Sequence, residues 1–135
     1  MIKEAYCSKE VSILLKEKGF NEKCRGGYHY EFDDNDNPIV MFEEWMTQPY
    51  NNDFVDEGFL CSAPTHQMAM AWLREKYNVV IVIDVCRETG REGFYCWQLE
   101  DNRTGDWIVN IVGECPTYEQ ACEEALKYCL EKIIK

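Results

Sequence analysis

The segment from Ser62 to Val85 (SAPTHQMAMAWLREKYNVVIVIDV) constrains the fold of this chain more than any other. It predicts a helix that begins near Pro64 or Thr65 and ends at Asn78, followed directly by a strand. The strand, Val79–Val85, is apolar on both faces, which is typical of a central strand in a covered sheet. We therefore expect this strand at the centre of a sheet.

One apolar stripe follows the predicted helix at spacings of three and four residues. Its members are Met68, Ala69, Trp72 and Leu73, and we expect all four to be buried. His66 lies away from the centre of this stripe, so we expect it to face solvent. The segment as a whole is thus explained as core.

Hydrophobic periodicity predicts six further elements along the chain. They are helices over 8–18 and from Thr117 onward, and strands over 28–32, 39–45, 94–99 and 107–112. The order is therefore α-β-β-α-β-β-β-α. It predicts a single α+β domain over residues 1–135, in which two or three helices pack on an antiparallel sheet. Two sub-units, 1–45 (αββ) and 62–135 (αβββα), are joined by loop 46–61.

Net charge excludes several classes of partner. The formal charge is −11 and the pI is near 4.6, which disfavours binding to nucleic acid or to an anionic membrane. No apolar stretch approaches the roughly 20 residues of a membrane span, and the first 20 residues hold no signal-peptide core. We expect a cytoplasmic protein and, as the minority reading of such acidity, a basic partner.

The middle helix and the last helix carry a resemblance to known proteins. The patterns APTHQMAMAWLREKYNVVIVI (63–83) and TYEQACEEALKYCLEKII (117–134) resemble a set of small proteins of Bacteroides-type gut bacteria and their phages or mobile elements. The run CSKEVSILLKEKGF (7–20) is similar to the same set. This resemblance implies an accessory, mobile-element-associated role in the cytoplasm, and it implies no particular activity.

The order of elements in residues 65–134 is also similar to that of double-stranded-RNA-binding domains. Those domains carry a basic cluster where their last helix begins. This chain has carboxylates there instead, at Glu114, Glu119, Glu123 and Glu124. The resemblance is therefore one of topology and does not extend to function.

One group of residues has the spacing of a calcium-binding loop, but it has a simpler explanation. Asp33, Asn35, Asn37 and Glu44 match positions 1, 3, 5 and 12 of a calcium loop, but Pro38 replaces its glycine, and a hairpin turn explains the same residues. We expect no metal or other cofactor, because zinc spacings and phosphate-binding glycine loops are also missing.

A cysteine and a histidine lie close in sequence near the start of the middle helix. Cys61 precedes the helix, whose dipole could lower its pKa, and His66 is a candidate base. The pair fits no local signature of a nucleophilic enzyme, and the simpler explanation is a buried thiol beside a solvent-facing imidazole. We retain Cys61 and His66 as weak catalytic candidates and expect no enzyme.

The loop before the middle helix combines aromatic and acidic residues. Its candidate interaction residues are Trp45, Tyr50, Phe54, Phe59, Asp53, Asp56 and Glu57. Aromatic side chains in such a loop either cover the core as a lid or form a recognition patch. We expect a non-catalytic protein that binds another protein here. A nucleic-acid mimic, a nucleic-acid-associated module and a thiol enzyme are the alternatives, and a homo-oligomer stays open.

The eight cysteines lead to a prediction about oxidation state. They are scattered, at 7, 24, 61, 86, 96, 115, 122 and 129, and several occupy apolar helix or strand positions. Without a secretion signal we expect reduced thiols that act as small apolar residues. Thiol titration of the protein unfolded without reductant should therefore find eight free thiols. A lower count would show that disulfides form.

Overall fold

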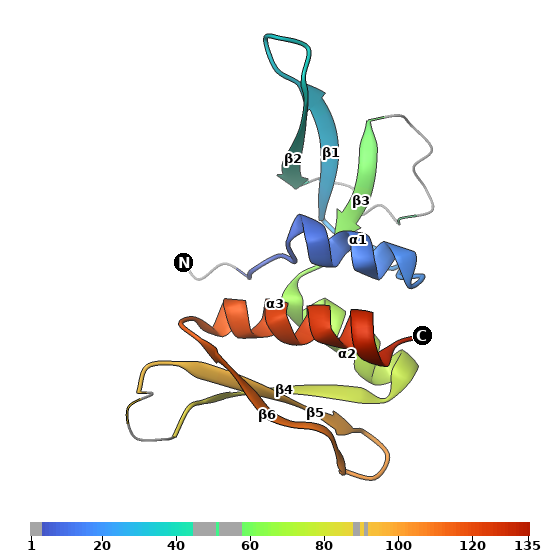
Figure 1. The fold of residues 1–135 in the computed structure, drawn as a ribbon. Helices are drawn as coiled ribbons and strands as arrows, with labels where there is room; N and C mark the ends of the chain where they lie inside the picture. Colours follow the sequence, from blue (N-terminus) through green and yellow to red (C-terminus); the bar gives the residue numbers. More distant parts are fainter. Residues whose placement is uncertain (1–3, 45–50, 52–57, 88–89, 91) are drawn as a thin grey trace. The chain divides into compact units, whose positions relative to one another are not determined.

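The computed structural model describes residues 4–44, 51, 58–87, 90 and 92–135. These residues form three α-helices and six strands, and the strands make two antiparallel sheets of three (Figure 1). The chain divides into two compact units, Met1–Thr65 and His66–Lys135. Each unit contains one of the two sheets.

The first unit combines one helix with a three-stranded sheet. Its elements are α1 (Lys9–Glu17), β1 (Gly26–Phe32), β2 (Pro38–Glu44) and β3 (Phe59–Ala63). The strand order is β2-β1-β3, and both pairings are antiparallel. Helix α1 packs against β3, as Figure 1 shows.

Local contacts at both ends of α1 explain the helix that the sequence predicts over 8–18. The Ser8 side chain caps the first turn by accepting a hydrogen bond from the Val11 amide at 3.2 Å. Gly19 ends the helix with φ of 93°, and the Phe20 amide then donates to the Leu15 carbonyl at 2.9 Å. Val11, Leu15 and Phe20 are buried in the core of this unit.

The predicted hairpin is confirmed, and its acidic turn is held by side-chain hydrogen bonds. Asp33 Oδ1 accepts from the amides of Asn35 and Asn37, each at 2.9 Å. Asp36 takes the left-handed conformation with φ of 59°, which Asp tolerates better than most residues. The turn therefore fixes the register that pairs Phe32 with Pro38.

Strand β3 lies partly within the segment that the sequence assigns to loop 46–61. It pairs with β1, which moves the boundary of the first unit to Thr65. Asn51 supports this strand: its Oδ1 accepts from the Ser62 amide at 2.7 Å, and its Nδ2 donates to the Phe20 carbonyl at 2.8 Å. Because this side chain is buried, its hydrogen bonds replace those that water would make.

The second unit has two helices on one face of its sheet (Figure 1). Its elements are α2 (His66–Tyr77), β4 (Val79–Val85), β5 (Tyr95–Asp101), β6 (Trp107–Cys115), α3 (Tyr118–Tyr128) and a π-helical turn, η2 (Cys129–Ile133). The Thr117 hydroxyl caps α3 by accepting a hydrogen bond from the Gln120 amide at 3.1 Å, at the residue where the sequence predicts this helix to begin. Leu73, Leu99 and Leu126 are fully buried and form its core.

Burial along α2 confirms the predicted stripe at Ala69, Trp72 and Leu73, but Met68 is 37% exposed, so that member of the stripe is wrong. His66 and Met70 are buried as well, because α2 contacts both β4 and α3. A second expectation, for β4, is also wrong. The strand order is β4-β5-β6, so β4 is an edge strand within this sheet and does not lie at its centre.

The α+β class is confirmed, and every predicted helix and strand is present. Strand β3 is an addition, and the strands form two sheets where we expected one. A single domain remains a prediction. Among the described residues, no helix is both long and apolar enough to span a membrane.

Gly26 provides a test of packing in the first unit. A Cβ at this position would lie 2.8 Å from the Tyr6 ring and 2.9 Å from the Ala63 carbonyl oxygen. Gly26→Ala should therefore lower the free energy of unfolding by about 1–3 kcal/mol, measured by urea denaturation.

Gly58→Ala is the matched control. The nearest atom to its new Cβ is the Tyr30 carbonyl oxygen at 3.9 Å, so we expect a change within about 0.5 kcal/mol. Equal effects of the two substitutions would contradict the close approach at Gly26.

Candidate functional site

One face of the β1–β2 hairpin is aromatic and partly exposed. The pairs Tyr28–Phe42 and Tyr30–Val40 place four of these side chains on the same face, and Phe32 follows on β1. We call these five residues the hairpin surface.

The hairpin surface is packed at its base and exposed toward the turn. The Phe42 ring lies 5.0 Å from the Tyr6 ring and 5.5 Å from the Tyr28 ring, between centroids. The Tyr28 hydroxyl donates to the Cys7 carbonyl at 2.7 Å. Phe42 is nevertheless 41% exposed, as is Tyr30, and Phe32 near the turn is 69% exposed. Among the rings of this surface only that of Tyr28 is half-buried, so the surface as a whole adds little to the core.

Carboxylates lie at the turn of the hairpin and on both of its faces, with Glu31 and Glu43 on the face opposite the aromatic rings, and residues 26–44 contain no Lys or Arg. The acidic residues are Glu31, Asp33, Asp34, Asp36, Glu43 and Glu44. Hydrogen bonds from the Asn37 and Asn35 amides lower the pKa of Asp33, so it is ionised at neutral pH. His29 lies between two of the carboxylates, with Nε2 3.0 Å from Glu31 and Nδ1 3.6 Å from Glu43.

Only one of the seven predicted interaction residues lies in the described part of the chain. Phe59 is half-buried at the start of β3, and the Lys16 ammonium lies 5.6 Å from its ring centroid. The other six lie outside the described residues: Trp45, Tyr50, Asp53, Phe54, Asp56 and Glu57. The acidic and aromatic character expected there is also present on the neighbouring hairpin.

Cys61 does not have the environment of an activated thiol. It is fully buried in β3, opposite Tyr28, and burial raises its pKa to about 11 although Lys16 opposes the shift. The expectation that the helix dipole could lower this pKa is therefore wrong. Cys61 lies within β3, several residues before α2 begins at His66. Desolvation therefore has a larger effect on the thiol pKa than the helix dipole has.

His66 faces the interior of the second unit, and the expectation of a solvent-facing side chain is wrong. It is 5% exposed, and its Nε2 lies 2.8 Å from the Glu123 carboxylate on α3. This contact joins α2 to α3, since His66 begins one helix and Glu123 lies in the other. Cys61 and His66 belong to different compact units.

The calcium-loop spacing does not bring its members together. Asp33 lies at the hairpin turn, whereas Glu44 pairs with Gly26 at the opposite end of β2. The strand between Pro38 and Glu44 rises about 20 Å, far more than one ion can bridge. The turn alone accounts for these residues.

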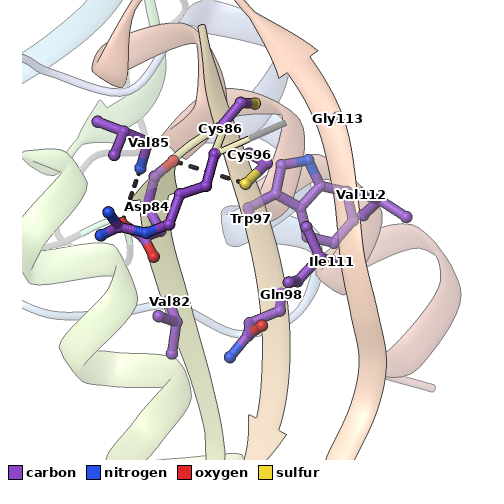
Figure 2. Close-up of a pocket in the computed structure, with 11 residues that line it drawn as sticks. Val82, Asp84, Val85, Cys86, Cys96, Trp97, Gln98, Ile111, Val112 and Gly113 are labelled. Carbon is purple, nitrogen blue, oxygen red and sulfur yellow. Dashed lines mark hydrogen bonds and ion pairs between the residues drawn. The ribbon is translucent and has the colours of Figure 1, made fainter. Parts of the chain in front are cut away.

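A hollow of about 300 Å³ lies on the sheet of the second unit, and sequence reasoning missed it (Figure 2). We call it the outer hollow. Its lining residues are Val82, Asp84, Val85, Cys86, Arg87, Cys96, Trp97, Gln98, Ile111, Val112 and Gly113. The sequence held one indication of this hollow, which is that β4 is apolar on both faces. We assigned both faces to the core.

Polar groups of the outer hollow gather at its β4 side. The Arg87 guanidinium lies 3.3 Å from the Asp84 carboxylate, and the Cys96 thiol donates to the Asp84 carbonyl at 3.6 Å (Figure 2). The Gln98 amide donates to Glu100 at 2.9 Å. The β6 side contributes Ile111 and Val112, so the hollow is apolar with a charged rim.

Comparisons with protein-family models, with curated proteins and with solved structures gave no significant match.

The burial of Cys61 predicts its reactivity. With a pKa of about 11, only about one thiol in 10,000 is ionised at pH 7, and the folded structure shields it. Iodoacetamide at pH 7 should modify the half-exposed Cys86 before Cys61, as read by peptide mass spectrometry. Modification of Cys61 should become rapid only after unfolding in urea. Preferential labelling of Cys61 in the folded protein would restore the catalytic hypothesis.

Proposed function

We propose that this protein is a non-catalytic binding protein whose hairpin surface takes up a basic segment of another protein. The observation that supports this most directly is the composition of residues 26–44. Exposed aromatic rings lie there among carboxylates, without a single Lys or Arg. Such a strip attracts cations and offers apolar contact area in the same place.

The aromatic rings of the hairpin surface and the nearby carboxylates would contribute to binding in different ways. Tyr30 and Phe32 can bury large ring areas against a partner at little entropic cost, because aromatic side chains have few rotatable bonds. The carboxylates of the turn, which begins directly after Phe32, can pair with Lys or Arg, and the rings can take part in cation–π contacts with the same residues. Tyr28 contacts Phe42 on the same face, at the base of the hairpin.

The alternatives differ in the partner that they require. Nucleic-acid mimicry is the special case in which the basic partner is a nucleic-acid-binding protein. A nucleic-acid-associated module would need a basic surface, whereas the whole chain carries a net charge of −11. A thiol enzyme receives no support from the raised pKa of Cys61. An association with phages or mobile elements stays an expectation.

Selection from a displayed library of random peptides tests the proposal. The wild-type protein should enrich peptides in which Lys or Arg flanks an aromatic or aliphatic residue. The double variant Tyr30→Ser/Phe32→Ser should bind the best synthetic peptide at least about tenfold more weakly, measured by fluorescence anisotropy. Both side chains are exposed, so the variant should keep its fold, which circular dichroism would verify.

Trp107→Ser is the control, because it removes a comparably exposed aromatic side chain from the second unit. We expect it to bind the peptide like the wild type. The proposal fails if the selected peptides lack basic residues, or if the double variant binds as tightly as the control.

A further inference from the structure

The second sheet has an apolar outer face opposite its helices. The Trp97 ring packs at a tilt of 50° against Tyr128 of α3, with 5.4 Å between the centroids, which places the odd-numbered residues of β5 toward the helices. Gln98 therefore points to the outer face, and its registered partner Val82 lies beside it in the outer hollow. Ile111 borders the hollow and is 60% exposed. An antiparallel sheet with one solvated face normally carries polar residues there.

A large aromatic side chain projects from the same face. Trp107 pairs with Glu100, and Glu100 accepts a hydrogen bond from the Gln98 amide two residues away. These contacts place Trp107, Glu100 and Gln98 on one face of the sheet. Trp107 is 56% exposed, although Trp is among the most costly side chains to leave in water.

The protruding indole and the hollow lie at different points along β6. Trp107 begins the strand, and the hollow is lined by Ile111, Val112 and Gly113. A separation of four to six residues corresponds to about 13–20 Å along the strand. This spacing prevents Trp107 from filling the hollow of its own chain.

We propose that a second copy of this chain docks on this outer face, with Trp107 of each copy inserted into the outer hollow of the other. A twofold axis between the two features brings each indole to the facing hollow, because an isologous contact pairs one patch with itself. The hollow of about 300 Å³ is large enough to hold an indole ring. The inference is independent of the function proposed for the hairpin surface.

The charges on this face support a second copy as the occupant. Arg87 lies at the rim of the hollow, where it pairs with Asp84 at 3.3 Å, and Glu100 lies beside Trp107. Under the twofold axis that inserts the indole, Glu100 of one copy would share the Arg87 guanidinium of the other with Asp84. Val82 and Ile111, which line the hollow on this face, are uncharged, as expected near the centre of a homodimer interface. Protrusion, hollow and complementary charges are thus all present on one patch.

Sedimentation of the full chain at several concentrations tests the dimer. The wild type should associate with a Kd in the range of about 1–100 µM at physiological ionic strength, where the charge repulsion between copies is screened within about 8 Å. Trp107→Ala should raise the Kd at least about tenfold. Val82→Glu, which places a charge in the hollow, should do the same.

Mixing the two variants distinguishes reciprocal insertion from a general loss of apolar surface. Trp107→Ala retains its hollow and Val82→Glu retains its indole, so a mixed dimer keeps one of the two insertions. We therefore expect the mixture to associate more tightly than either variant alone. Phe32→Ser, on the other unit, should dimerise like the wild type.

Three outcomes would overturn the proposal. They are a wild type that stays monomeric at about 1 mM, about tenfold above the highest expected Kd, a Trp107→Ala variant that dimerises normally, and a mixture no tighter than its components. Circular dichroism of each variant confirms that it is folded before these results are interpreted. Peptide binding by the hairpin surface is measured separately, so failure of either proposal leaves the other intact.

Discussion

Helices cover only one face of the second sheet, and most of the arrangement in that unit depends on this constraint. The covered face buries Trp97, Leu99 and Leu126, and burial of such side chains supplies most of the stability of a small fold. The Trp97 indole donates to Glu124 of α3 at 3.0 Å, so its polar group is satisfied within this packing. Within the described part of the second unit, no helix lies against the other face, which retains apolar residues.

The first sheet leads to a similar result by a different route. Helix α1 packs against β3, whereas the β1–β2 hairpin continues beyond the packed part of the unit toward its acidic turn. Tyr6 and Cys7 cover Tyr28 and Phe42 at the base of the hairpin. This cover is partial, because Phe42 and Tyr30 are each 41% exposed and Phe32 is 69% exposed. Both proposed surfaces therefore arise where sheet area exceeds the area that the helices can cover.

Acidity separates the two surfaces chemically. The hairpin surface lies among carboxylates, and a second copy would present the same negative charge to it. A basic partner fits that surface better than self-association does. The outer face of the second sheet has an uncharged centre and carries both Arg87 and Glu100, which is compatible with contact between identical copies.

Local chemistry made much of the fold predictable. Ser8 and Thr117 accept backbone hydrogen bonds within one turn, Gly19 tolerates a positive φ, and Asp33 closes its own turn. Each of these effects depends on residues less than five positions apart. Strand β3 escaped prediction because a long-range pairing with β1 defines it, and its five residues show no alternation.

The candidate sites also combine features that the sequence predicted with features that depend on tertiary contacts. The sequence by itself determined the acidic charge, the helix ends, the aromatic alternation of the hairpin and the α+β class. Tertiary structure alone decided that His66 faces Glu123, that Cys61 is buried in a strand, and that β4 is an edge strand. An apolar residue pattern specifies that a face avoids water, but which surface covers that face depends on contacts between residues distant in the chain.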